Sequence, residues 1–128
     1  MKLLLDTHTF LWFLREPDKL PAAVRKEIEV AGSDAAVSLV TLWEIAIKVL
    51  LDKLSLPMEY EDLFPHAVPD SGLSLFAIEP SHLAAVRRLP WHHRDPFDRL
   101  LIAQAQVENL TLVSRDSHFA AYGVSLLW

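Results

Sequence analysis

The sequence contains no cysteine, so it forms no disulfide bonds and offers no thiolate ligands to a metal. It has no apolar run long enough to span a membrane, and Asp6 ends the apolar start of the chain well short of a signal peptide. Positive charge is also scarce. The net charge of −5 excludes a protein whose whole surface binds nucleic acid by counterion release. We therefore expect a cytoplasmic protein that holds any polyanion at a local site.

One segment carries a local excess of basic side chains. These side chains are Arg87, Arg88, His92, His93, Arg94 and Arg99, opposed only by Asp95 and Asp98. Two interpretations are open from the residues alone: a loop that binds a polyanion, or a solvated charged loop.

The size and composition fit one globular domain over residues 1–128, with 52% apolar residues. Strands and helices are expected to alternate along the chain. The expected strands are 2–5, 35–39, 73–78, 111–114 and 124–127, and the expected helices are 7–14, 20–31, 41–51, 81–88, 98–107 and 117–122. Three prolines restrict residues 57–72 to short helical turns, so we expect a variable insertion there.

This alternation predicts the fold class. Short, uniformly apolar strands separated by helices are typical of an α/β fold in which a parallel sheet is covered by helices on both faces. In such sheets ligands bind beyond the carboxyl ends of the strands. The helix at 41–51 is almost wholly apolar, and we expect it to be buried on most sides.

Four acidic residues are expected near that edge of the sheet. Asp6 and Asp116 follow two of the expected strands. Glu44 lies near the start of the helix after the second strand, and Asp98 opens the helix before the strand at 111–114. Their carboxylates are candidates for one functional site.

Each acid also has a purely structural interpretation. Asp6 and Asp116 are suited to cap helices, and Glu44 is spaced to form a surface ion pair with Lys48. The segment from Asp95 to Asp98 matches a helix start with an N-cap, a proline and an acid near the helix dipole. Capping does not explain Glu44 on an apolar helix, nor why all four acids gather at one end of the sheet.

Carboxylates brought together repel one another, and a hard cation relieves this repulsion through oxygen coordination. Mg²⁺ or Mn²⁺ is therefore the expected cofactor. A zinc site is disfavoured because cysteine is absent and the adjacent His92 and His93 point apart on any regular element. Such a metal centre next to a basic loop indicates phosphodiester hydrolysis.

The same residues carry a family resemblance over nearly the whole chain. The matching segments are residues 4–8 with Leu11 and Trp12, Ser38 with residues 42–48, then 93–105 and 111–116. In these segments the chain resembles the PIN-domain family, and within it the VapC-type toxins. The last segment matches least fully, because Ser114-Arg115 stands where a threonine and a small residue are frequent.

The resemblance implies a three-layer α/β sandwich and a metal-dependent endoribonuclease that serves as the toxin of a toxin–antitoxin pair. Magnesium or manganese would be held by Asp6, Glu44, Asp98 and Asp116, which would form the catalytic quartet. Thr7 and Ser114 would orient ligands or water, and Asp95 would cap the helix and support the ligands without touching the metal.

The resemblance also implies partners. Family members usually form homodimers and are silenced by a small antitoxin whose helix occupies a hydrophobic groove. Here that groove would involve the helices at 7–14 and 20–31, with Trp12 and Trp43 as anchors; the alternative is that both tryptophans belong to the core. The substrate would be RNA, and no membrane partner is expected.

Two rival functions remain to be weighed. A phosphatase of the haloacid dehalogenase type needs a second aspartate two residues after Asp6, where His8 stands. A catalytically inactive PIN-like module that binds a protein partner or RNA would not need an intact acidic quartet.

Overall fold

The computed structural model describes residues 2–128. Its centre is one five-stranded sheet, in the order β3-β2-β1-β4-β5, with every neighbouring pair parallel. The strands are β1 (Leu3–Leu5), β2 (Ala35–Ser38), β3 (Ser74–Phe76), β4 (Thr111–Val113) and β5 (Leu126–Leu127). All five fall within the segments expected from the sequence, with shorter ends.

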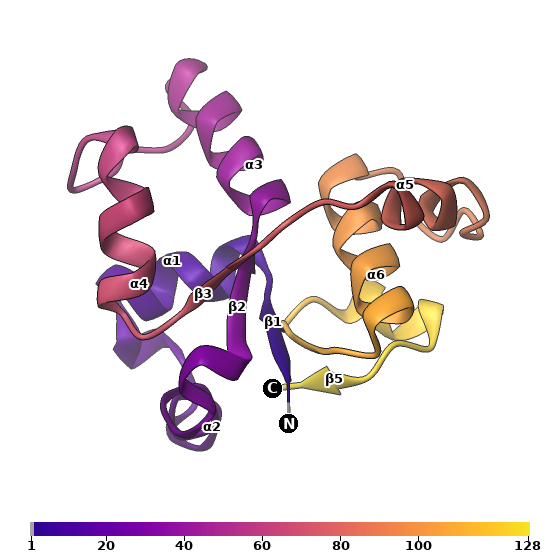
Figure 1. Cartoon of the computed structure of the whole chain (residues 1–128), viewed down its shortest axis with the longest axis horizontal. Coiled ribbons are helices and arrows are strands. Elements are labelled where there is room, and N and C mark those ends of the chain that lie inside the picture. Colours follow the sequence, from indigo (N-terminus) through magenta and orange to yellow (C-terminus); the bar gives the residue numbers. More distant parts are fainter. Residues whose placement is uncertain (1) are drawn as a thin grey trace.

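Helices lie on both sides of this sheet (Figure 1). The α-helices are α1 (Thr7–Arg15), α2 (Ala22–Ala31), α3 (Leu39–Leu50), α4 (Val68–Asp70), α5 (Pro80–Arg87) and α6 (Pro96–Glu108). Short helical turns are η1 (Pro17–Lys19), η2 (Gly32–Asp34), η3 (Tyr60–Asp62), η4 (Leu63–Ala67) and η5 (Ser117–Tyr122). The expected three-layer α/β sandwich is confirmed. Over residues 2–128, no helix is long and apolar enough to cross a membrane.

One apolar core lies on each face of the sheet, because successive side chains of a strand point to opposite faces. Leu3 and Leu5 of β1 belong to the core under α1 and α2, whereas Leu4 belongs to the core under α6. The turns between residues 57 and 72 contribute Leu63 and Val68 to the first core. The expected insertion is therefore a packed part of the domain.

Polar caps explain why two helices begin earlier than expected. Ser38 ends β2, and its hydroxyl accepts a hydrogen bond from the backbone N–H of Val40 at 3.0 Å. The helix that follows therefore begins at Leu39 instead of residue 41. Asp95 accepts from the backbone N–H groups of Phe97 and Asp98, so α6 begins at Pro96.

The apolar α3 is buried on most sides, as expected, except on one outer face. That face exposes Leu39, Trp43 and Leu50, the last of these to 81%. These residues recur at the spacing of one helix face, so they form an apolar stripe that is largely exposed.

The order in which strands are added to the sheet switches sides between β1 and β4. From β1 the chain moves outward through β2 to β3, and it later returns to β4 and β5 on the other side of β1. In parallel sheets this switch point leaves a crevice at the carboxyl ends of the two central strands. Asp6 follows one of these strands and Ser114 follows the other.

Candidate active site

Asp6 lies at the switch point and is almost fully buried, with 6% of its surface exposed. Its Oδ1 accepts a hydrogen bond from the backbone N–H of Thr9 at 2.8 Å, so it caps α1. Its Oδ2 accepts from the Ser114 hydroxyl at 2.6 Å. Burial raises the pKa of Asp6, and the bonds from Ser114 and Thr9 oppose that shift. Capping alone thus uses only one of the two carboxylate oxygens.

Glu44 points inward from α3, and 4% of its surface is exposed. The Thr7 hydroxyl donates to its Oε1 at 2.7 Å, and the Lys48 ammonium lies 2.6 Å from its Oε2. The ion pair expected from the sequence therefore exists. It is not an ordinary surface pair, since the carboxylate is buried at the end of the sheet beside Thr7.

Asp98 lies in the first turn of α6, with 20% of its side chain exposed. Its pKa is raised from 3.8 to about 8, most strongly by burial and then by the charges of the neighbouring carboxylates. These carboxylates belong to Asp95, Glu44, Asp6 and Asp116. Asp98 is thus surrounded by the other three acids of the expected quartet.

Asp116 caps η5 by accepting from the backbone N–H of His118 at 2.9 Å, and the His118 ring Nδ1 lies 2.9 Å from the same oxygen. The Ser114 hydroxyl connects Asp116 to Asp6: it accepts from the backbone N–H of Asp116 at 3.0 Å and donates to Asp6. Ser114 therefore fixes the ends of β1 and β4 relative to each other.

The four acids are neighbours without forming a closed coordination shell. Within residues 2–128, no group of three His, Asp or Glu side chains is arranged to hold one ion as placed. Hydroxyl groups, Lys48 and His118 occupy oxygens of three of the acids. The donor set nevertheless suits a hard divalent cation, because it consists of carboxylate oxygens whose repulsion a cation would relieve.

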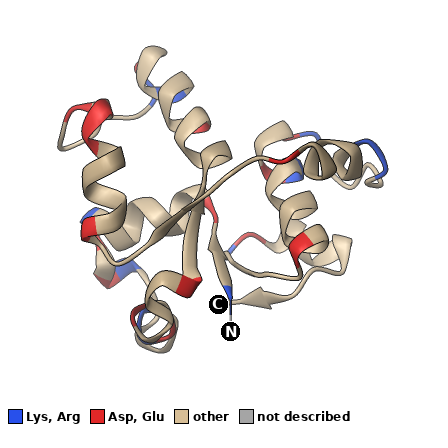
Figure 2. Cartoon of the chain, viewed as in Figure 1, with Lys and Arg blue, Asp and Glu red and all other residues tan. Residues whose placement is uncertain are grey.

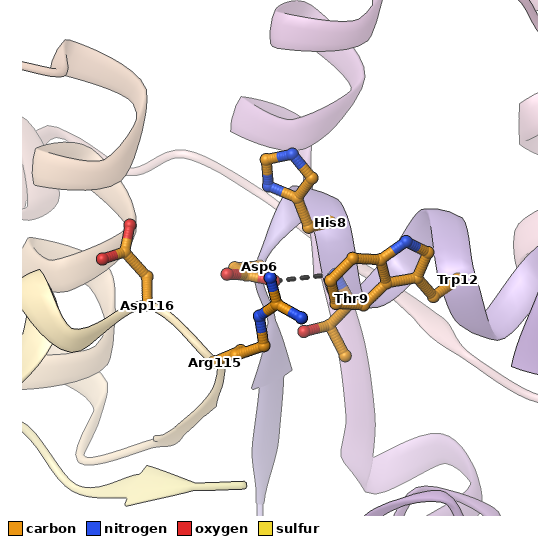
Figure 3. Close-up of a pocket in the computed structure, with 6 residues that line it drawn as sticks. All are labelled: Asp6, His8, Thr9, Trp12, Arg115 and Asp116. Atoms are coloured by element: carbon orange, nitrogen blue, oxygen red, sulfur yellow. Dashed lines mark hydrogen bonds between the residues drawn. The ribbon is translucent and has the colours of Figure 1, made fainter. Parts of the chain in front are cut away.

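A pocket of about 290 Å³ opens beside Asp6 and Asp116 (Figure 3). His8, Thr9, Trp12 and Arg115 complete its lining. The Asp6 carboxylate points toward the side on which Asp116 lies, and the Arg115 guanidinium lies near the Trp12 ring. Carboxylates, a cation and an aromatic face thus line one recess.

Comparison with known proteins fits this arrangement. The model of the PIN domain family matches residues 3–124. The chain belongs to the PIN domain family. No curated protein matches its sequence.

Several solved structures share the fold. This PIN domain is similar to the structure of VapBC2 from Rickettsia felis bound to a DNA fragment from its promoter, with 17% identity over 99% of this chain and 98% of that chain and a TM-score of 0.73. DNA-bound VapBC from Salmonella typhimurium matches at 20% identity, 99% and 97% coverage and a TM-score of 0.73. A toxin–antitoxin complex from Klebsiella pneumoniae matches at 17% identity, 98% and 96% coverage and a TM-score of 0.62.

The basic residues between positions 87 and 99 do not form one RNA-binding loop. Arg99 departs most clearly from that expectation. Only 6% of Arg99 is exposed. Its guanidinium donates to the carbonyls of Leu89 and Pro90 and to the Tyr122 hydroxyl, and it stacks on Trp91 at 4.1 Å. Arg99 therefore holds the loop before α6 in place and has no free donor face for RNA.

The other members of the segment are divided between two surfaces. Arg88 lines a pocket with Gln106 and Val107 on the outer side of α6, at the end of α5 where Arg87 is also exposed. His92, His93 and Arg94 line another pocket with Trp91. Figure 2 shows basic positions spread over several elements of the fold.

His93 is the member of this segment that reaches the acids. Its Nδ1 lies 2.8 Å from the Tyr122 hydroxyl, its ring stacks on His118, and its Nε2 lies 3.6 Å from Oδ2 of Asp98. Among residues 2–128, that Nε2 is the buried side-chain atom left without a hydrogen-bond partner. Burial lowers the pKa of His93, with the charge of His118 acting in the same direction.

The two expected groove tryptophans lie on different elements and face different neighbours. Trp12 of α1 is half-buried and lines the acidic pocket. Trp43 of α3 is 51% exposed and packs edge-on against Phe97 of α6, with 4.9 Å between ring centroids. Trp43 thus faces α6 and not the expected groove of α1 and α2.

Sequence reasoning missed His8 and Arg115 as lining residues. His8 stands two residues after Asp6 and Arg115 stands directly before Asp116, so proximity to the acids in the chain was the available signal. That signal does not tell which side chains turn toward the pocket.

Proposed function

We propose that this PIN domain is an endoribonuclease that depends on Mg²⁺ or Mn²⁺ and serves as the toxin of a toxin–antitoxin pair. The surroundings of Asp98 carry the proposal: burial is the largest cause that raises its pKa to about 8, and the charges of four other carboxylates add to the shift. Gathering like charges costs stability, and such sites are retained where a cation or a reaction uses them.

Asp6, Glu44, Asp98 and Asp116 would hold the metal. A bound divalent ion would lower the pKa of a water molecule and neutralise charge that develops on the scissile phosphate. Thr7 and Ser114 would keep the carboxylates of Glu44 and Asp6 in place through their 2.7 and 2.6 Å hydrogen bonds. Asp95 would act through the start of α6, since it accepts two backbone hydrogen bonds there.

The test is cleavage by the purified protein of a single-stranded RNA and of the DNA of the same sequence, in Mg²⁺, in Mn²⁺ and in EDTA. We expect cleavage of RNA alone, and only with metal. The double variant Asp6→Asn with Asp98→Asn should be inactive, while the exposed Asp70→Asn control should cut like the parent. Equal cleavage by the double variant and the parent would overturn the site assignment.

Metal binding has an independent readout in thermal melting. Because a ligand that binds only the folded state stabilises it, Mn²⁺ added after EDTA should raise the melting temperature of the parent and not of the double variant. Metal-independent melting and no RNA cleavage together would favour the rival function, an inactive PIN-like module that binds a protein or RNA.

We further propose a small antitoxin and a second copy of the chain as partners. The toxin–antitoxin complex with a similar fold supports the first, and the exposed stripe of Leu39, Trp43 and Leu50 supports an apolar contact. Sedimentation of the parent and of Leu50→Glu tests the dimer. Co-expression with the cognate antitoxin should suppress RNA cleavage.

A further inference from the structure

The pocket beside the acids contains two side chains that the metal chemistry does not use. The Arg115 guanidinium carbon lies 5.3 Å from the centroid of the Trp12 ring, within the range of a cation–π contact. Both side chains line the same recess as Asp6 and Asp116 (Figure 3). We propose that Trp12 and Arg115 form a subsite for one unpaired nucleotide next to the scissile phosphate, with its base on Trp12 and its phosphate on Arg115. This inference rests on the proposed ribonuclease function.

Trp12 has the properties of a fixed stacking platform. It is half-buried and packs against the core under α1 and α2. The His8 ring lies 5.8 Å and the Trp128 ring 6.0 Å from its centroid, both tilted to it. The Lys19 ammonium also lies over the ring at 6.0 Å and the Arg115 guanidinium at 5.3 Å. These neighbours hold the indole at the edge of the pocket, and a base that stacks there takes the place of one of the two cations.

Arg115 supplies the positive charge that a polyanion needs at this point. The chain has a net charge of −5, and the acids repel an approaching phosphate. Arg115 is exposed on the loop after β4, directly before Asp116. Its planar guanidinium lies over the indole in the free protein, and when a base replaces it there it can pair with the adjoining phosphate in a bidentate manner.

The geometry favours an unpaired nucleotide over a duplex. Bases stack on aromatic side chains when they are free of their own neighbours, as in single strands and loops. A pocket of about 290 Å³ is small for a ligand site, so it suits part of a strand and not a helix. Stacking on an aromatic ring is tolerant of sequence, so the subsite would select strand state more than base identity.

The experiment measures binding without cleavage, in the Asp98→Asn background. The probes are a fluorescein-labelled single-stranded RNA of mixed sequence, an abasic ribose-phosphate strand of the same length, and the corresponding RNA duplex. The variants are Trp12→Leu, which keeps apolar packing without an aromatic face, Trp12→Phe, and Arg115→Ala. Arg25→Ala is the matched control, because Arg25 is exposed on α2 and pairs with Glu29.

Trp12→Leu should raise the Kd for the base-bearing strand about 5- to 150-fold, the equivalent of about 1–3 kcal/mol for one stacked base. It should leave the Kd for the abasic strand and the duplex unchanged, and Trp12→Phe should restore most of the loss. Arg115→Ala should weaken both single strands and reduce the salt dependence of binding. Arg25→Ala should bind like the parent.

Two results would overturn the subsite. One is an equal effect of Trp12→Leu on the Kd for the base-bearing and the abasic strand. The other is a parent protein that binds the two strands with the same Kd. Either result would favour a protein partner as the ligand of this pocket. Cleavage by the protein with native Asp98 separates this failure from failure of the proposed function. If that protein cuts RNA with an intact KM after Trp12→Leu, only the subsite is wrong, whereas absence of cleavage refutes the ribonuclease itself.

Discussion

The two halves of the acidic cluster are held in different ways. Asp6 and Glu44, which follow or face β1, are buried, and each accepts a hydrogen bond from a hydroxyl group. Asp98 and Asp116 belong to the α6 and η5 side, are more exposed, and lie next to imidazole rings. The first half is fixed in position by hydroxyl donors, together with the Lys48 ammonium beside Glu44. The second half keeps a charge imbalance that protonation or a cation can relieve.

The largest effect is expected where this imbalance is greatest. Asp98→Asn should lower RNA cleavage on the order of 1,000-fold, because it removes a carboxylate from the proposed metal centre. The same change should stabilise the metal-free protein at pH 8, since it removes a charge that the neighbouring carboxylates oppose. Initial cleavage rates and urea denaturation in EDTA measure the two quantities. A parallel loss of activity and stability would show that Asp98 is merely structural.

For the half that is held by hydroxyl groups, we expect activity and stability to fall together. Thr7→Val keeps the shape of the side chain but removes the donor to buried Glu44, which should destabilise the protein by about 2 kcal/mol. Activity should fall with it, because Glu44 loses its fixed position. Thr111→Val is the matched control: its hydroxyl contacts Ser125 at an exposed site, and the change should cost less than about 0.5 kcal/mol. Equal effects of the two substitutions would refute the positioning role of Thr7.

The pH dependence of stability sharpens the comparison further. The Asp98 carboxyl keeps its proton in the folded state up to about pH 8, but in the unfolded chain only up to about 3.8. The folded state therefore binds more protons between these values, and stability falls as the pH rises from about 4 to 8.

This pH effect has an upper bound of about 6 kcal/mol, and because solvent reaches Asp98 we expect about 2 kcal/mol. The free energy of unfolding of the metal-free protein at pH 5 and pH 8 measures it. Asp98→Asn should flatten the slope, and Mn²⁺ should reduce it in the parent. A parent that is more stable at pH 8 than at pH 5 in EDTA would contradict this.

The smallest effect is expected at Asp95, which stands three residues before Asp98 and has a different task. Asp95→Ala should cost about 1 kcal/mol, because the backbone N–H groups of Phe97 and Asp98 lose their cap. RNA cleavage should fall by less than tenfold. Thermal melting and cleavage rates check this, and a loss as large as that of Asp98→Asn would instead place Asp95 in contact with the metal.

Much of the fold could be predicted because its signals are local. Apolar runs mark β1, β2 and β4, and the Asp95-Pro96 pair marks the start of α6. The exposed outer face of α3 could not be predicted, because apolar composition indicates burial without saying whether a neighbour in the same chain provides it. The burial of Arg99 could not be predicted for a related reason: its charge suggests solvent, whereas the carbonyls that satisfy its guanidinium lie up to thirteen residues away.

The sequence by itself determined the class of fold, the family, and the four acids at strand ends and helix starts, because each depends on residue type and spacing along the chain. Only the tertiary structure decided which side chains face one another. Ser114 reaches Asp6, which is 108 positions away in the chain, and Arg115 meets Trp12, because parallel pairing brings the ends of β1 and β4 together. Such contacts depend on strand order and register, which no local pattern specifies.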